Sequence, residues 1–364
     1  MKELLRLLIL INVAIILTSC STEKYKGEYI ENSIIWKGLE REYLIYLPSR
    51  YNTKELFPLL MGLHGYTGTA SGFEKETTKG MNHHAEKHQF IAVYPQGSYF
   101  WGKKGNYPFF VSSWNDIESN AEPREGERQI CSNKREEYPK PEECKKYSHC
   151  AWTSCHDDVG FIKEVLNQVT KEYKVDKSRR YLVGMSNGGA MAHRFGCLHP
   201  ELLAAVVSVS GSIPRDRSCT PNQPLPYMQV FGDKDETTPI NGELSIDGWY
   251  YEKPDISFEK WANALGCKKE MKDANLSIAK ERGLICLARR NCSEISSHEV
   301  VNCLIPGGKH AWPGQTEGKG YCITTEQKAS IPRYSQCQES DLEELNWGNE
   351  IIWQFLSKHR KDNE

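Results

Sequence analysis

A serine flanked by glycines is the first sign of chemistry in this sequence. Gly184-Met185-Ser186-Asn187-Gly188 follows the apolar run 181–183 and precedes residues that can form a helix. Small residues around a serine allow the backbone to turn sharply, so that the hydroxyl is presented at the end of a strand. The same spacing also fits an ordinary glycine-rich connection between a strand and a helix. Ser186 can be interpreted as a nucleophile only if the rest of the chain supplies its partners.

Candidate partners occur later in the chain. Acyl transfer by a serine needs a base and a carboxylate that orients the base. Asp233, Asp235 and Glu236 directly follow the apolar run 227–231, and His310 lies on a glycine-rich loop after the apolar run 300–305. For Asp233 and Glu236 we favour a solvated acidic turn. The resulting order of serine, acid and histidine is that of the α/β-hydrolase arrangement.

Backbone donors for an oxyanion can also be placed. One is the N–H of Asn187, directly after the serine, and the other is the N–H of Tyr66, on the loop 64–68 that follows an early apolar run. His64 is expected to brace this loop rather than to react. The joint order and placement of these residues predict a serine hydrolase, for which no metal or organic cofactor is expected.

The remaining histidines receive structural interpretations. His193 lies on the helix after the serine and is expected to be packed or on the surface. His83, His84 and His88 are expected on an exposed helix face. A metal cluster at those three histidines is the alternative, and we predict no metal site.

Apolar periodicity predicts the elements that must position these residues. Strands alternate with helices, which predicts an α/β fold with a mostly parallel central sheet and helices on both faces. We expect one domain over residues 34–360. Buried strands are predicted at 58–63, 90–95, 181–183, 203–209, 227–231 and 300–305, a hairpin at 33–36 and 41–48, and helices at 79–88, 157–173, 189–198, 257–265 and 342–359.

The N-terminus resembles an export signal. Lys2 and Arg6 flank the start of the apolar run from Leu4 to Leu17, which is too short and wrongly flanked for a membrane span. Leu17-Thr18-Ser19-Cys20 resembles a bacterial lipobox, which predicts a signal peptide over residues 1–19, lipidation of Cys20 and a tether over residues 20–33. An ordinary secretory peptide is the alternative. Ser21 after the lipidated residue favours, by resemblance, the outer membrane or cell surface.

Charge and cysteine content restrict the partners and the compartment. The 364 residues carry a formal net charge of −2, which provides no electrostatic basis for binding nucleic acid. Without Cys20, 12 of the 13 cysteines remain, all between Cys131 and Cys337. In an exported chain they are interpreted as up to six disulfides, with zinc ligands as the minor alternative. Four of them lie in a charged stretch at 116–156, which predicts a disulfide-tied insertion, and a second such loop is expected in the 310s to 330s.

Several motifs together resemble secreted esterases of the polyhydroxybutyrate depolymerase and feruloyl esterase group, akin to family-one carbohydrate esterases. The shared segments lie within residues 57–314, and the most specific is Gly307-Gly308-Lys309-His310-Ala311-Trp312-Pro313-Gly314. The others are Leu63-His64-Gly65, Tyr94-Pro95-Gln96-Gly97, Trp114-Asn115, Asp157-Asp158-Val159-Gly160-Phe161, Gly184-Met185-Ser186-Asn187-Gly188-Gly189 and Phe231-Gly232-Asp233-Lys234-Asp235 with Pro239.

The resemblance implies further roles. It selects Asp235 as the acid and implies a Cys197–Cys219 disulfide. The family has histidine and threonine where Phe231 and Asp233 stand here, so the surroundings of the acid differ. Trp114 and Trp312 are expected to line the acyl or sugar side of the pocket, with a place in the core as the equal alternative.

The expected function is that of an extracytoplasmic serine esterase that forms an acyl-enzyme. Candidate substrates are feruloylated or acetylated polysaccharide, hydroxyalkanoate esters and small esters. The membrane is expected to be contacted only through the lipid anchor. Two rivals are a serine peptidase of the prolyl-oligopeptidase type and a non-catalytic surface lipoprotein that binds glycans or another protein.

Overall fold

The computed structural model describes residues 27–77, 81–104, 107–116, 156–211, 213–246, 248–292, 295–314, 322–323, 335–336 and 347–361. The predicted signal peptide, the lipidation residue Cys20 and the part of the predicted insertion between residues 117 and 155 lie outside these ranges.

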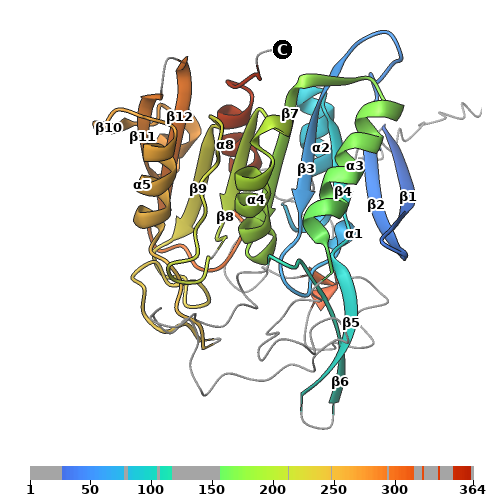
Figure 1. Ribbon diagram of the computed structural model, residues 1–364, viewed down its shortest axis with the longest axis horizontal. Coiled ribbons are helices and arrows are strands. Elements are labelled where there is room, and N and C mark those ends of the chain that lie inside the picture. The colour runs from blue at the N-terminus through green and yellow to red at the C-terminus, as the bar shows by residue number, and fades with distance from the viewer. Residues whose placement is uncertain are drawn as a thin grey trace, which may run out of the picture.

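A ten-stranded sheet runs through the molecule in the order β1-β2-β4-β3-β7-β8-β9-β12-β11-β10 (Figure 1). Neighbouring strands from β4 to β12 pair in parallel, and the strands outside them pair antiparallel. The central strands β3, β4, β8 and β9 are buried along their whole length, as expected for strands covered on both faces. Their bounds are β1 Glu28–Trp36, β2 Leu39–Leu47, β3 Phe57–Leu63, β4 Ile91–Pro95, β7 Val175–Met185, β8 Ala205–Val209, β9 Tyr227–Gly232, β10 Met271–Asp273, β11 Ile285–Cys292 and β12 Ile295–Ile305.

Two helical layers cover the sheet (Figure 1). One comprises α3 (Asp158–Glu172), α4 (Asn187–Leu198) and α5 (Pro254–Ala264), and the other comprises α1 (Ala70–Glu76), α2 (Met81–His88), α6 (Ser277–Glu281) and α8 (Trp347–Leu356). Each layer closes its own hydrophobic core against one face of the sheet. A short 3-10 helix, Pro200–Leu202, follows α4. The prediction of a mostly parallel sheet with helices on both faces is therefore confirmed.

The first strand corrects one predicted boundary. Residues 28–33 were assigned to the polar tether, but they form most of β1, which pairs along its length with β2. Alternate side chains from Ile30 onward are partly buried, and those between them face solvent. The stretch looks polar because an edge strand packs only one face, and backbone pairing with β2 does not depend on side-chain polarity.

Two parts of the fold were not predicted. The sheet is extended beyond β12 by the antiparallel strands β11 and β10, and the strands β5 (Ser98–Lys104) and β6 (Tyr107–Ser113) form a hairpin of their own. In Figure 1 this hairpin projects below the sheet. The dipeptide Gly105-Asn106 between the two strands is a hairpin turn signal that was overlooked, and Pro108 in the second strand weakens the strand pattern. Two further strands, β13 (Cys322–Ile323) and β14 (Ser335–Gln336), pair in parallel.

Three disulfides lie in the described part of the chain. Cys286 and Cys303 face each other across β11 and β12, Cys267 after α5 joins Cys292 at the end of β11, and Cys197 joins Cys219. Such bonds indicate that the chain folds in an oxidising compartment. Among the helices of the described residues, none has the length and apolarity needed to cross a membrane.

Candidate active site

Ser186 stands on a sharp turn between β7 and α4. Its backbone has φ 55° and ψ −123°, a region that costs a non-glycine residue energy. The turn is held from both sides, because the Ser186 N–H donates to the Val209 carbonyl at 2.8 Å and its carbonyl accepts from the Ala190 N–H at 2.9 Å. The side chain is half-buried. The conformation therefore presents the hydroxyl at the C-terminal edge of the sheet, as the spacing of the motif predicts.

Two glycines make this turn sterically possible. A Cβ atom on Gly184 would lie 2.1 Å from the Gly188 carbonyl oxygen, and one on Gly188 would lie 2.3 Å from the His64 carbonyl oxygen. Both obstacles are backbone atoms, which cannot move aside as a flexible side chain could. The close approach of α4 to β3 and β7 thus explains the glycines on either side of Ser186.

The structure brings Ser186, His310 and Asp235 together in one chain of contacts. His310 Nε2 lies 2.9 Å from Ser186 Oγ, and His310 Nδ1 lies 2.7 Å from Asp235 Oδ2. Asp235 follows β9 and His310 follows β12, and these strands are parallel neighbours whose C-terminal ends lie at the same edge. The Asp235 side chain is fully buried, and that of His310 is 8% exposed.

Asp235 is kept ionised although it is buried. Burial by itself raises the pKa of this carboxyl, but hydrogen bonds from His310 and Thr238, together with the charge of His310, outweigh it and hold the pKa below its ordinary value. Thr238 donates its hydroxyl to Oδ2 at 2.5 Å and its N–H to Oδ1 at 2.8 Å. The sequence analysis did not identify Thr238. Its spacing of three residues after an aspartate on a turn is the signal that could have done so.

Asp233 was expected in a solvated acidic turn, but its side chain joins two loops of the site. Its carboxylate accepts from the Gly307 N–H at 2.6 Å, and its own N–H donates to the Ile305 carbonyl at 3.2 Å. These bonds tie the loop after β9 to the loop that carries His310. Asp233 therefore positions the two loops relative to each other. Glu236, in contrast, is exposed as predicted.

His64 braces the loop next to the serine, as expected. Its Nε2 accepts from the Gly97 N–H at 3.0 Å and its Nδ1 donates to the Gly65 carbonyl at 2.7 Å, which defines a neutral ring with the proton on Nδ1. Complete burial lowers the pKa of His64 to about 4, and the charge of Arg41 acts in the same direction. The ring is therefore neutral at physiological pH, and it holds the loop that carries Tyr66.

Asn187 connects the turn that carries Ser186 to the segment before the predicted insertion. Its Oδ1 accepts from the Trp114 N–H at 2.7 Å, and its Nδ2 donates to the Trp114 carbonyl at 3.1 Å. Because Asn187 is the first residue of α4, its backbone N–H belongs to the unsatisfied first turn of that helix. Tyr66, the other predicted donor residue, is half-buried on the loop after β3.

The two tryptophans predicted to line the pocket belong to the core. Trp114 and Trp312 have exposed fractions of 0% and 1%. The Trp114 indole donates to the His64 carbonyl at 2.7 Å, and the Trp312 ring packs edge-to-face on Phe73 with centroids 5.5 Å apart. The prediction of substrate contact is therefore wrong for both side chains. Both large apolar rings point into the protein.

A buried ion pair links β2 and α3 next to the segment that carries Trp114. Arg41 on β2 contacts Asp158, at the start of α3, at 2.6 Å, and both side chains are almost fully buried. Asp158 also accepts from the Asn115 N–H at 2.6 Å. The Arg41 guanidinium lies 4.0 Å from the centre of the Phe161 ring. This cluster joins β2, α3 and the segment that carries Trp114, which explains Asp158, whereas Asp157 caps α3 by accepting from the Gly160 N–H at 3.0 Å.

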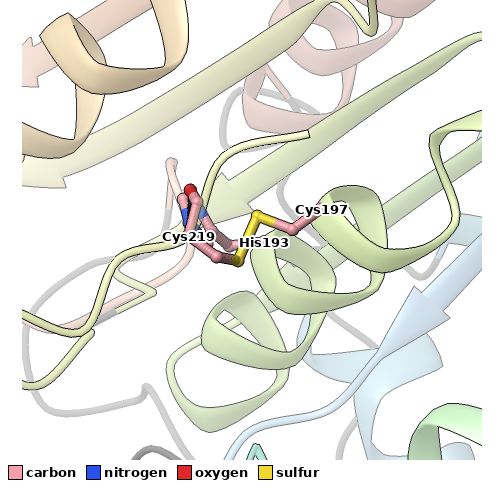
Figure 2. A group of neighbouring side chains, drawn as sticks. All are labelled: His193, Cys197 and Cys219. Carbon is pink, nitrogen blue, oxygen red and sulfur yellow. Dashed lines mark hydrogen bonds between the residues drawn. A yellow bond between two sulfur atoms is a disulfide. The ribbon is translucent and has the colours of Figure 1, made fainter. Parts of the chain in front are cut away.

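The Cys197–Cys219 disulfide implied by the family resemblance is present, beside His193 (Figure 2). His193 Nε2 lies 3.1 Å from the Cys219 carbonyl oxygen and Nδ1 lies 3.3 Å from the Tyr227 hydroxyl. Burial lowers the pKa of His193 to about 3. The three side chains are close enough to suggest a metal site. However, the sulfur atoms are bonded to each other, and a thiolate is what a metal binds. This histidine is a packed residue of the core.

The fold and the site together define a class of protein. Parallel strands in this order, a serine on a strand-to-helix turn, and an aspartate and a histidine on later loops are the features of a serine hydrolase with the α/β-hydrolase fold. Residues 57–246 match the model of the family described as serine hydrolase (FSH1), and the chain belongs to that family. The matched range contains Ser186 and Asp235.

Curated relatives match part of the chain. The chain is 31% identical over 170 residues to a putative esterase, NocK, of Nocardia uniformis subsp. tsuyamanensis, a match covering 44% of this chain and 49% of that protein. It is 29% identical over 167 residues to feruloyl esterase B of Piromyces equi, covering 43% of this chain and 29% of that protein. The matches thus span about half or less of the length of these relatives.

Among solved structures, acetyl xylan esterase from Aspergillus awamori superposes with a TM-score of 0.47 at 14% identity, covering 77% of this chain and 94% of that one. The strand order of this chain, rather than that likeness, defines its fold.

Proposed function

We propose that the protein hydrolyses carboxylic esters, with Ser186 as the nucleophile. The observation that carries the proposal is the relay in which His310 Nε2 lies 2.9 Å from Ser186 Oγ and Nδ1 lies 2.7 Å from Asp235 Oδ2. These distances are within the range needed for proton transfer from the hydroxyl and for orientation of the imidazole.

The proposed reaction proceeds in two halves. Ser186 Oγ attacks the ester carbonyl while His310 Nε2 takes the hydroxyl proton, and collapse of the tetrahedral intermediate gives that proton to the leaving alcohol. Water then attacks the acyl-serine, with His310 as base and then as acid, and releases the carboxylic acid. Asp235 holds the proton on Nδ1 and stabilises the imidazolium. The N–H groups of Asn187 and Tyr66 are the proposed oxyanion donors.

The proposed substrates are feruloyl or acetyl esters of polysaccharides, with hydroxyalkanoate esters as the next candidates. Support comes from the names of the relatives, a putative esterase and a feruloyl esterase. It also comes from the sequence motifs shared with esterases of that group.

The catalytic assignment is tested with Ser186→Ala and a matched control. Wild type and Ser33→Ala, which removes an exposed hydroxyl on β1, are expected to hydrolyse p-nitrophenyl esters and to be labelled by a fluorophosphonate probe. Ser186→Ala is expected to lose nearly all turnover and all labelling while remaining folded by circular dichroism. Retained turnover in Ser186→Ala would contradict the proposal. A panel of methyl ferulate, acetylated xylan, hydroxybutyrate oligomers and a peptide amide then ranks the substrates and separates an esterase from a peptidase.

We also propose that Cys20 carries a lipid and anchors the domain to a bacterial membrane. Because β1 begins at Glu28, residues 21–27 are the link, and even fully extended they reach only about 25 Å. The catalytic domain would therefore be held close to the membrane surface. Expression of the full chain with an alkyne-labelled fatty acid is expected to label wild type but not Cys20→Ser. Equal labelling of the two chains would exclude the anchor.

A further inference from the structure

Two histidines and a glutamate meet between helices on the face of the sheet opposite α4. His84 and His88 lie one turn apart on α2, so both project from the same side of that helix. Glu350 is in the first turn of α8. Both histidines were expected on an exposed helix face, but the His84 side chain is 3% exposed and those of Glu350 and His88 are 16% and 20% exposed. The packing of α8 against α2 covers them.

The three side chains converge on one point. His84 Nδ1 lies 3.3 Å from Glu350 Oε1, and His88 Nε2 lies 3.1 Å from each oxygen of that carboxylate. One ligand atom from each of the three residues can be chosen so that all lie within 4.8 Å of one another. In a tetrahedral zinc site with bonds of about 2.0–2.1 Å, neighbouring ligand atoms are separated by about 3.3–3.4 Å. The nitrogen-to-oxygen separations are therefore close to those of a coordination shell, and the two nitrogens lie within 4.8 Å of each other.

His84 supplies a second and independent indication. Neither of its ring nitrogens makes a hydrogen bond of acceptable geometry, although the residue is buried. A buried polar group without such a partner is costly and calls for an explanation. The Nδ1 atom faces the Glu350 carboxylate, the position at which a bound cation would satisfy it.

The surrounding structure holds the three groups in place. Asn82, on α2, donates to Glu74 at 2.8 Å and accepts from the Tyr94 hydroxyl at 2.6 Å. Asn349 on α8 donates to the Thr77 carbonyl. The Trp353 ring stacks on His88 with centroids 5.3 Å apart. Both helices are thus fixed to the neighbouring elements, which is the preorganisation that a metal site requires.

We propose that His84, His88 and Glu350 form a binding site for a divalent transition metal, with zinc as the best match. Two imidazoles and one carboxylate are a donor set that zinc binds with an open fourth position, which water would fill. The ion would join α2 to α8, two helices far apart in the sequence. The site is distinct from the catalytic relay, so its existence does not depend on the proposed esterase activity.

Lys87 is the natural competitor of the metal. Its ammonium group contacts Glu350, and its side chain is 55% exposed, so it can swing into solvent when an ion binds. Metal affinity should therefore fall in some variants and rise in another. Removal of a ligand should abolish binding, whereas Lys87→Met should strengthen it by about 2- to 5-fold, the factor expected from an exposed ion pair.

The test uses the full chain with its disulfides intact and without a polyhistidine tag. After treatment with EDTA and removal of the chelator, Zn²⁺ is titrated by calorimetry, and Co²⁺ is added separately to read its visible spectrum. Wild type should take up one equivalent of Zn²⁺, show the intense absorption of four-coordinate Co²⁺, and unfold at a higher temperature with the metal than without it. Glu350→Gln and His88→Gln should lose all three effects, and Lys87→Met should bind more tightly.

His199 provides the control variant for the metal titration. His199→Gln removes a histidine whose Nδ1 lies 3.1 Å from the Glu201 carboxylate in a surface pair without a second imidazole, and it should bind zinc like wild type. Esterase activity without metal should be unchanged in all these variants, because none of the residues belongs to the catalytic relay. The absence of stoichiometric uptake by wild type, or uptake that persists in both Glu350→Gln and His88→Gln, would overturn the proposal.

Discussion

Backbone strain at Ser186 leads to a prediction about protein stability with an unusual sign. Ser186 adopts φ 55° and ψ −123°. Such conformations cost a residue with a Cβ about 1–3 kcal/mol, and glycine adopts them without this cost. Replacing Ser186 by glycine should therefore relieve strain that Ser186→Ala retains.

The magnitude follows from a comparison of these two variants. Both lack Oγ and its contact with His310, so that loss cancels. Glycine gains about 1–3 kcal/mol from relieved strain and loses about 0.4–1 kcal/mol because its unfolded chain is more flexible. Ser186→Gly should thus be more stable than Ser186→Ala by about 1 kcal/mol, and both should be inactive.

The assay is equilibrium unfolding in urea with the disulfides intact, followed by tryptophan fluorescence and circular dichroism. Ser33, in the regular strand β1, provides the control pair, because there glycine should be less stable than alanine by about 0.5–1 kcal/mol. The stability difference between the glycine and alanine variants should therefore have opposite signs at Ser186 and at Ser33. The prediction is refuted if Ser186→Ala is as stable as Ser186→Gly, or more stable.

Three further predictions concern the surroundings of the site. Gly188→Ala should destabilise the protein by about 1–3 kcal/mol and reduce kcat/KM by at least about 10²-fold, because the new Cβ would lie 2.3 Å from the His64 carbonyl oxygen. Urea unfolding measures the stability and ester kinetics measure kcat/KM, and wild-type values of both would contradict the prediction. Arg41→Met should cost about 3–5 kcal/mol because Asp158 would remain buried without its partner, and a loss below about 1 kcal/mol in urea would disprove this. The pKa of Asp235 is lower in the folded protein than in the unfolded chain. Its charge therefore stabilises the fold above about pH 4, and this contribution is lost as the pH falls through the folded value. The stability difference between wild type and Asp235→Asn should consequently narrow as the pH falls below about 4 in urea titrations, and a constant difference would contradict the linkage.

Much of the architecture around the serine could be predicted from short stretches of sequence. Continuous apolar runs marked the central strands, and glycines on both sides of Ser186 marked a turn too tight for side chains. These features are local, because a strand covered on both faces must be apolar and a sharp turn excludes Cβ atoms whatever the rest of the chain does. The order of Ser186, Asp235 and His310 could be predicted for the same reason, since each residue lies in the turn or loop after its own strand.

Other features depended on packing between distant segments. The indole rings of Trp114 and Trp312 could have faced a pocket or the core, and only the assembled layers turned them inward. Asp233 acquired its role from the pairing of β9 with β12, which sets the loops after these strands side by side.

The contact between His84 and Glu350 shows most clearly what could not be predicted from the sequence. Residues so far apart in the sequence can meet only because α2 and α8 pack on the same face of the sheet. The sequence alone determined the strand-to-helix turn and the chain order of the reactive groups, because those depend on adjacent residues. Tertiary structure alone decided which side chains are buried, which loops support the site and which histidines meet a carboxylate, because those contacts arise from strand pairing and helix packing that no short pattern encodes.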